Sequence, residues 1–272
     1  MRALDDPGFK PSKLVGDLIR QTHARITAET ELLTRLRRID AADPADWEDI
    51  LQVVGLFQAL GSKSAHARQR AALSSVDEVP VPLEALVEAA LSETEPNVAG
   101  ALRWALARSG DGGAVLLAEG LGSPVAAVRE RAVQSLAELP GGEATAQLRD
   151  ALVNPDPVVR GYAALALGTR GVADALPTLI DMIVEGWNDT DAADALSVLA
   201  RDTATADQIA TELVDRLAAH GTAEAPARGR LTQALAAVPG PTASRALLEL
   251  SHDEDRAIAL TAAYLLQLGD AR

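Results

Sequence analysis

A three-residue pattern of a leucine, any residue and a carboxylate returns six times along the chain. It occurs at Leu86–Glu88, Leu117–Glu119, Leu148–Asp150, Leu179–Asp181, Leu213–Asp215 and Leu247–Glu249. The intervals between successive leucines are 31, 31, 31, 34 and 34 residues, which is typical of stacked repeat proteins. Because two residues along an α-helix correspond to about 200° of rotation, leucine and carboxylate should point in opposite directions. The pattern predicts a row of buried leucines backed by a row of exposed acids.

Each repeat is expected to contain two helices. In the clearest unit, residues 152–181, Asn154–Pro157 forms a turn that starts a first helix, and Gly168–Val172 breaks it. Asp174 is the expected N-cap of the second helix. One position of the first helix holds Leu106, Leu136, Leu167, Leu199, Leu235 and Leu266. We expect second helices over residues 81–92, 113–120, 143–152, 174–185, 206–219 and 242–250.

The two ends of the chain depart from this repeat. Residues 1–62 do not follow its register and contain two expected helices, roughly 13–38 and 45–60. They are interpreted as an N-terminal extension and helical cap. Residues 63–272 are interpreted as an array of about six units whose last unit stops after a first helix, about 255–268. Its apolar residues spread around more than one side of that helix: Ile258, Ala262, Leu265, Leu266 and Leu268. Self-association or docking of a partner at this end is one expectation, and burial by the preceding repeat is the alternative.

The composition favours helices and excludes several chemistries. About one residue in five is alanine, only 3% are aromatic, and cysteine is absent. Disulfides, thiolate metal sites and cysteine nucleophiles are therefore excluded. No apolar run reaches 18 residues and the first residues lack the apolar centre of a signal peptide, so a cytoplasmic protein is expected.

The net charge of −14 lies almost wholly in the repeats. Residues 1–80 hold 11 basic and 12 acidic groups and residues 81–272 hold 14 and 27, so the array carries −13. Such a surface repels phosphates, which argues against nucleic acid and anionic membranes and favours a partner protein with a basic surface. The alternative is that the acids only maintain solubility or reflect salt adaptation. The three lysines against 22 arginines are typical of a GC-rich or salt-adapted bacterial or archaeal proteome.

The segment Asn154-Pro-Asp-Pro-Val-Val-Arg160, followed by Ala163-Ala-Leu-Ala-Leu-Gly168, resembles the short HEAT-like repeat of phycobilisome lyases. The resemblance covers about residues 64–268. The arginine of the repeat is kept as Arg129 and Arg160, and Arg228 is a further candidate. It implies an all-α, right-handed α-α superhelix whose second helices line the concave side. It also implies that the arginine braces neighbouring repeats against an acidic loop residue, for which Asp156 is a candidate. A bilin lyase, or a lyase-related enzyme, is the alternative function that it implies.

No constellation of residues predicts catalysis, a metal or a cofactor. His23, His66, His220 and His252 are dispersed, and the cluster at residues 252–255 stands at a helix start, where acids are expected anyway. Paired carboxylates recur regularly along the array, whereas catalysis needs one irregular constellation.

The sequence therefore predicts a non-enzymatic scaffold or adaptor that binds a partner along an acidic concave face. The second helices hold 12 acids against three arginines. Trp187 lies in a loop, where it is either an exposed anchor or buried under the next repeat. The predicted partner-binding residues are Glu88, Glu119, Asp150, Asp181, Glu185, Trp187, Asp215 and Glu249.

Overall fold

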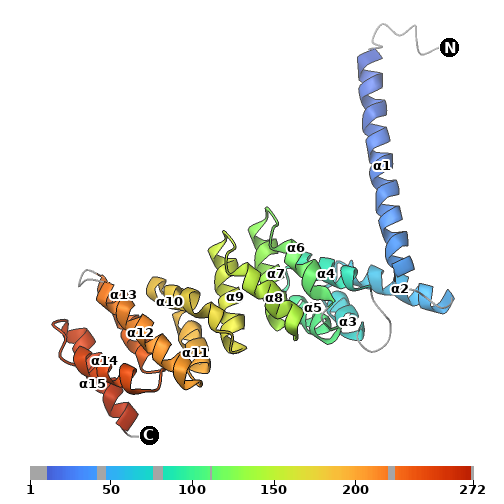
Figure 1. The fold of residues 1–272 in the computed structure, drawn as a ribbon. Helices are drawn as coiled ribbons and strands as arrows, with labels where there is room; N and C mark the ends of the chain where they lie inside the picture. The colour runs from blue at the N-terminus through green and yellow to red at the C-terminus, as the bar shows by residue number, and fades with distance from the viewer. Residues whose placement is uncertain (1–10, 42–46, 76–81, 111, 220–223, 271–272) are drawn as a thin grey trace, which may run out of the picture.

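The computed structural model describes residues 11–41, 47–75, 82–110, 112–219 and 224–270, and these residues form α-helices, short turns and no strand. Helices α3 to α15 stack in succession along the chain (Figure 1). The predicted fold class, an all-α solenoid of helix pairs, is confirmed. None of the described helices is both long and apolar enough to cross a membrane.

The helices form two alternating rows. The first helices are α3 (Ala65–Ser74), α5 (Pro96–Arg108), α7 (Ala126–Glu138), α9 (Pro157–Thr169), α11 (Asp189–Leu199), α13 (Ala225–Leu235) and α15 (Arg256–Asp270). The second helices are α4 (Leu83–Ser92), α6 (Gly113–Gly120), α8 (Gly142–Ala151), α10 (Leu176–Glu185), α12 (Thr203–Ala219) and α14 (Pro241–Leu250). They are preceded by α1 (Pro11–Ala41) and α2 (Trp47–Leu60).

Turn residues fix where these helices begin. Proline occupies the first turn of α5, α9, α13 and α14, where a missing N–H costs nothing. The prediction for Asp174 was wrong. A 3₁₀ turn, η1 (Ala173–Ala175), precedes α10 and no side chain caps that helix. Asp174 instead pairs with Arg149 on α8 at 2.9 Å.

Leucine and alanine make one continuous core along the array. All six leucines of the repeated pattern are at most 6% exposed, as are five of the six first-helix leucines, and Leu266 is half-buried. Small residues let neighbouring helices approach. A Cβ on Gly168 of α9 would lie 2.9 Å from that of Ala195 on α11. The volume and position of these side chains therefore set the spacing between repeats.

Three arginines join successive first helices through a carboxylate in the intervening turn. The ion pairs are Arg68–Glu93, Arg129–Asp156 and Arg228–Asp253, with N···O distances of 2.7, 2.6 and 2.5 Å. Each carboxylate also accepts backbone N–H groups at the start of the next first helix, as Asp156 does from Val158 at 2.9 Å. The guanidinium of Arg129 holds the pKa of Asp156 below its usual range. We call these three pairs the arginine clasps. The predicted Arg129–Asp156 contact is one of them.

Other arginines bind the carboxyl ends of helices in earlier repeats. Arg131 of α7 donates from Nε to the carbonyl of Leu91 in α4 at 2.7 Å. Arg230 of α13 donates from Nε to the carbonyl of Ile183 in α10 at 2.6 Å. These carbonyls lie in the last turns of their helices, where a cation is favourable.

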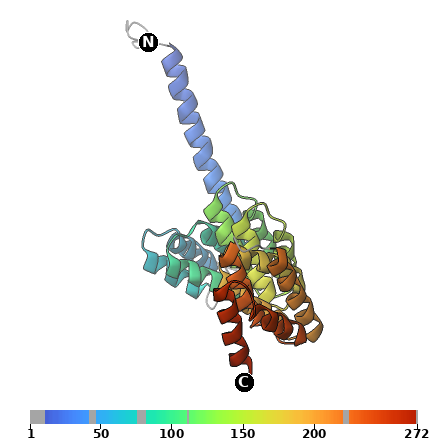
Figure 2. The same cartoon turned by 90° about the vertical axis from the view of Figure 1, so that its left-hand side faces the viewer.

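The two N-terminal helices behave differently from each other. Helix α2 packs on α3, and its Val53 and Leu56 are buried. Helix α1 contacts α2 and extends away from the array (Figures 1 and 2). The first repeat is therefore covered by α2, while most of α1 projects away from it.

We expect Asp156→Asn to destabilise the protein by about 2 kcal/mol at pH 7, because the charged clasp is lost while the cap is kept. Asp174→Asn is the matched control. Its ion pair is half exposed, with 50% and 60% of the two side chains accessible, and should contribute under about 1 kcal/mol. Urea unfolding measures both.

The Asp156 clasp should also leave a signature in the pH dependence of stability. Its pKa is lowered on folding, so its stabilisation is complete above the unfolded value near about 3.9 and is lost as the pH falls through the folded value. The difference between wild type and Asp156→Asn should therefore shrink below about pH 4. A difference that stays constant down to about pH 2 contradicts this origin.

Candidate functional site

The six repeated carboxylates are all exposed, whereas the leucines two residues earlier are all buried. We call this set the acidic row; it consists of Glu88, Glu119, Asp150, Asp181, Asp215 and Glu249. Each member stands on a different second helix, from α4 to α14. The alternation follows from helix geometry, since the side that packs against neighbouring helices holds the leucine.

Contacts between second helices bring some members of the acidic row together. Helix α6 packs between α4 and α8, and α12 packs on α14. Glu88 and Glu119 line one shallow cavity of about 520 Å³ between α4, α6 and α7. Asp181 on α10 is linked to α12 by an ion pair with Arg216 at 2.6 Å. Asp150, Asp215 and Glu249 are exposed on α8, α12 and α14.

A smaller cavity of about 340 Å³ lies between α9 and α10 and brings together three of the predicted partner-binding residues. Asp181 and Glu185 line it from α10, and Trp187 closes it from the following turn. Its remaining lining is mixed in character and consists of Pro157, Val158, Arg160, Gly161, Thr178 and Met182. We call it the Trp187 cavity. It offers carboxylates, a guanidinium and an aromatic ring within one concave site.

Trp187 is half-buried and packs on α9, the first helix of its own repeat. The turn that carries it has left-handed backbone at Gly186 (φ 75°) and Asn188 (φ 47°). This turn folds the indole back on α9, where it meets Tyr162 edge to face with ring centroids 5.6 Å apart. A Cβ on Gly161 would lie 2.0 Å from the indole Cζ3, so glycine is required there. Neither alternative from the sequence described this packing.

Arg160 occupies in α9 the position that the clasp arginines occupy in their helices, but it forms no ion pair with a carboxylate among the described residues. Its Nη1 donates to the carbonyl of Asn154, six residues earlier, at 2.8 Å. Arg129 and Arg68 donate in the same way to Ser123 and Ser62, also six residues earlier. Among the described residues, however, no carboxylate pairs with Arg160, and Trp187 follows α10 in that turn. Nε and Nη2 of Arg160 therefore remain available to a bound acceptor at the edge of the Trp187 cavity.

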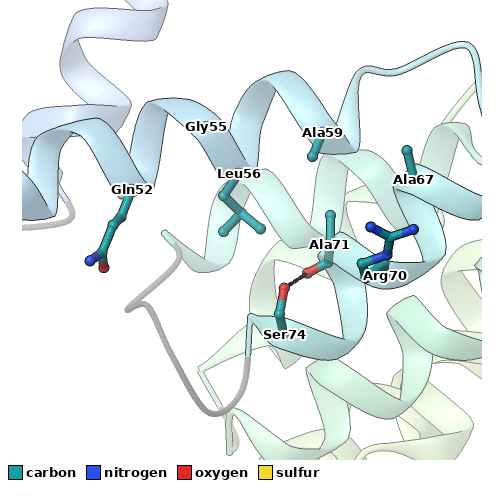
Figure 3. Close-up of a pocket in the computed structure, with 8 residues that line it drawn as sticks. All are labelled: Gln52, Gly55, Leu56, Ala59, Ala67, Arg70, Ala71 and Ser74. Carbon is teal, nitrogen blue, oxygen red and sulfur yellow. Dashed lines mark hydrogen bonds between the residues drawn. The ribbon is translucent and has the colours of Figure 1, made fainter.

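A further groove of about 620 Å³ lies between α2 and α3, outside the predicted set (Figure 3). Gln52, Gly55, Leu56 and Ala59 line it from α2, and Ala67, Arg70, Ala71 and Ser74 line it from α3. The Ser74 hydroxyl donates to the carbonyl of Ala71, so it satisfies its own helix. Arg70 follows Arg68 as Arg131 follows Arg129. The same Arg-x-Arg pattern therefore occurs in α3 and α7.

The C-terminal helix α15 is partly buried and partly exposed. Ile258 and Ala262 are buried by the preceding helices α13 and α14, and Leu265 and Leu266 are half-buried. Leu260, Tyr264 and Leu268 are 61%, 60% and 44% exposed. They recur every four residues and so lie along one side of α15.

The described part of the chain contains no group of three or more histidine, aspartate or glutamate side chains arranged to hold a metal. In the cluster at residues 252–255, the Asp253 carboxylate is engaged by Arg228 in a clasp. That cluster is therefore explained by packing between repeats.

Comparison with known proteins agrees with this architecture. The family model of HEAT repeats matches residues 113–200, which extend from α6 to α11. Residues 113–200 are HEAT repeats. The HEAT repeats thus include the Trp187 cavity and half of the acidic row. No curated protein matches the chain.

Several solved structures are similar to this chain at low identity. An engineered protein is 19% identical over 79% of this chain and 95% of its own, with a TM-score of 0.38. A karyopherin bound to the extreme C-terminus of a protein phosphatase is 12% identical over 90% of this chain and 32% of its own, with a TM-score of 0.48. Human deoxyhypusine hydroxylase in complex with glycerol is 19% identical over 92% of this chain and 99% of its own, with a TM-score of 0.35. At these identities the similarity concerns the fold alone.

We expect Gly161→Ala to displace the Trp187 indole and to destabilise the protein by about 1–3 kcal/mol, because the added methyl group overlaps the ring. Gly100→Ala is a matched control, since Gly100 has the same position in α5 and open space around it. Gly100→Ala should raise the free energy of unfolding by up to about 1 kcal/mol. Thermal unfolding checks both, and Trp187 fluorescence in a Trp47→Phe/Trp104→Phe background reports the indole. Equal effects of the two substitutions would contradict the assigned packing.

Proposed function

We propose that this HEAT-repeat chain is a non-enzymatic scaffold that binds a protein with a basic surface along its second helices. The observation that supports the proposal is the acidic row, in which one carboxylate per repeat is exposed on successive second helices. The row therefore contributes one exposed negative charge from each repeat. An extended basic segment, or a second array of basic side chains, would complement these charges.

Most of the acidic row lies apart from the clasps that join the repeats. The carboxylates of the clasps lie in turns between repeats. Within the row, Asp181 pairs with Arg216 of α12 in a partly exposed ion pair, and Glu88 also has an interaction partner. The other four acids, Glu119, Asp150, Asp215 and Glu249, are exposed outside the clasps, where a partner can reach them.

The Trp187 cavity is the proposed anchor point along this surface. A half-buried indole beside Met182 and Val158 offers apolar contact, and Glu185 and Asp181 offer acceptors for a basic side chain. The rest of the row then provides attraction and register rather than most of the binding energy. Nothing in the described residues favours the bilin-lyase alternative over this binding role.

The proposal is tested by affinity capture from native lysate with two matched variants as baits. The first carries Glu119→Gln, Asp150→Asn, Asp215→Asn and Glu249→Gln. The second carries Glu95→Gln, Asp191→Asn, Asp194→Asn and Glu254→Gln, four exposed acids outside the acidic row. Each variant has a net charge of −10, because four charges are removed from −14. Mass spectrometry quantifies the captured proteins.

Partners retained by wild type and by the second variant should be lost from the first, and their capture should fall steeply between about 50 and 500 mM salt. Equal loss from both variants would show that only net charge matters. Partners unaffected by either variant would contradict the proposal.

A further inference from the structure

Helix α1 presents an apolar surface that the rest of the chain leaves open. It projects from the array in both views (Figures 1 and 2) and would extend about 46 Å at 1.5 Å per residue. Eight of its nine large apolar side chains are 46–55% exposed. They are Leu14, Val15, Leu18, Ile19, Ile26, Leu32, Leu33 and Leu36.

These side chains lie on one face of the helix. At 100° per residue they fall, together with Ile39, within an arc of about 160°. Lys13, Asp17, Arg20 and Thr34 lie outside that arc. We call the apolar arc the α1 stripe. A free-standing helix with such a stripe is not a stable arrangement in water, because most helical stability comes from packing an apolar face.

The stripe ends beside a cavity of about 470 Å³ between α1 and α2. Leu32, Leu36 and Ile39 line it from α1, and Val54 and Phe57 line it from α2. The cavity is apolar on both sides and can accept several aliphatic side chains.

Two charged residues near the middle of the α1 stripe determine the direction in which a second α1 helix can pack on it. Arg25 and Glu29 both project within the apolar arc and form an ion pair along the helix at 3.7 Å. If two copies of α1 met in parallel and in register, Arg25 would face Arg25 and Glu29 would face Glu29. In an antiparallel pair centred at Thr27, each Arg25 faces a Glu29. Only the antiparallel pair places opposite charges together inside an apolar interface.

We propose that α1 forms an antiparallel two-helix pair with α1 of a second copy of this chain. In the register centred at Thr27, Leu18 lies opposite Leu36 and Val15 lies opposite Ile39. The N-terminal part of each stripe then enters the α1–α2 cavity of the other copy. Because α1 leads away from the array, the pair would carry one array at each end, with both acidic rows still open.

Sedimentation velocity of the full chain tests the pairing. Wild type is expected at twice the chain mass of 28.4 kDa, and Leu18→Glu should weaken dimerisation at least tenfold. Ala24→Glu, on the opposite face of the same helix, should leave it unchanged. Neither substitution touches the array, so the main thermal transition should be the same in all three proteins.

Charge exchange tests the role of the central pair. Arg25→Glu places acids opposite acids in an antiparallel dimer and should weaken it, and Arg25→Glu/Glu29→Arg should restore it. In a parallel dimer the double substitution would restore nothing, because like charges would still face each other.

Disulfide formation tests the direction independently, since the chain contains no cysteine of its own. A mixture of Leu18→Cys and Leu36→Cys chains should give the mixed disulfide, while Leu18→Cys alone should remain unlinked under the same mild oxidation. A monomer at high micromolar concentration overturns the proposal. So does a dimer that Leu18→Glu leaves intact, which would place self-association elsewhere, such as the exposed side of α15.

Discussion

The arginine clasps are the constraint on which the array depends. Each one ties a first helix to the amino end of the next, and the same carboxylate satisfies backbone N–H groups that would otherwise lack partners. Leucine packing alone is non-directional and would tolerate a range of rotations between repeats. A hydrogen-bonded pair of charges, partly shielded from water, accepts a much narrower range. The clasps therefore restrict the orientation between the helices that they join, which are α3 and α5, α7 and α9, and α13 and α15.

The clasps and the acidic row use different carboxylates, so the second helices can carry exposed acids without weakening the contacts between repeats. Structural carboxylates lie in the turns and are paired, whereas the acidic row lies on second helices whose buried side is leucine. Arg160 departs from this plan. It keeps the bond to a carbonyl six residues earlier but has no carboxylate partner among the described residues, and Trp187 stands in the following turn. The Trp187 cavity thus forms at a junction where the arginine is present but has no clasp carboxylate among the described residues.

The sequence predicted the repeating architecture well, because helix periodicity and turn residues are local signals. The second helices lie within three residues of their expected bounds, and the alternation of buried leucine and exposed acid is present in every unit. The prediction from sequence failed where contacts between residues far apart in the chain determine the structure. Asp174 looked like an N-cap but pairs with Arg149 on another helix, and the placement of Trp187 over Gly161 depends on two left-handed residues in one turn. The outward course of α1 also had no local signal, although its amphipathic pattern was visible.

The central claim is that the acidic row is the surface a protein partner meets. Carboxyl footprinting of the complex with a captured partner tests it most directly, because modification by a carbodiimide and an amine measures the accessibility of each acid. We predict that Glu119, Asp150 and Asp215 become protected in the complex, while Asp191 and Asp194 on a first helix react as in the free chain. Protection confined to first-helix acids, with the acidic row unchanged, would contradict the account.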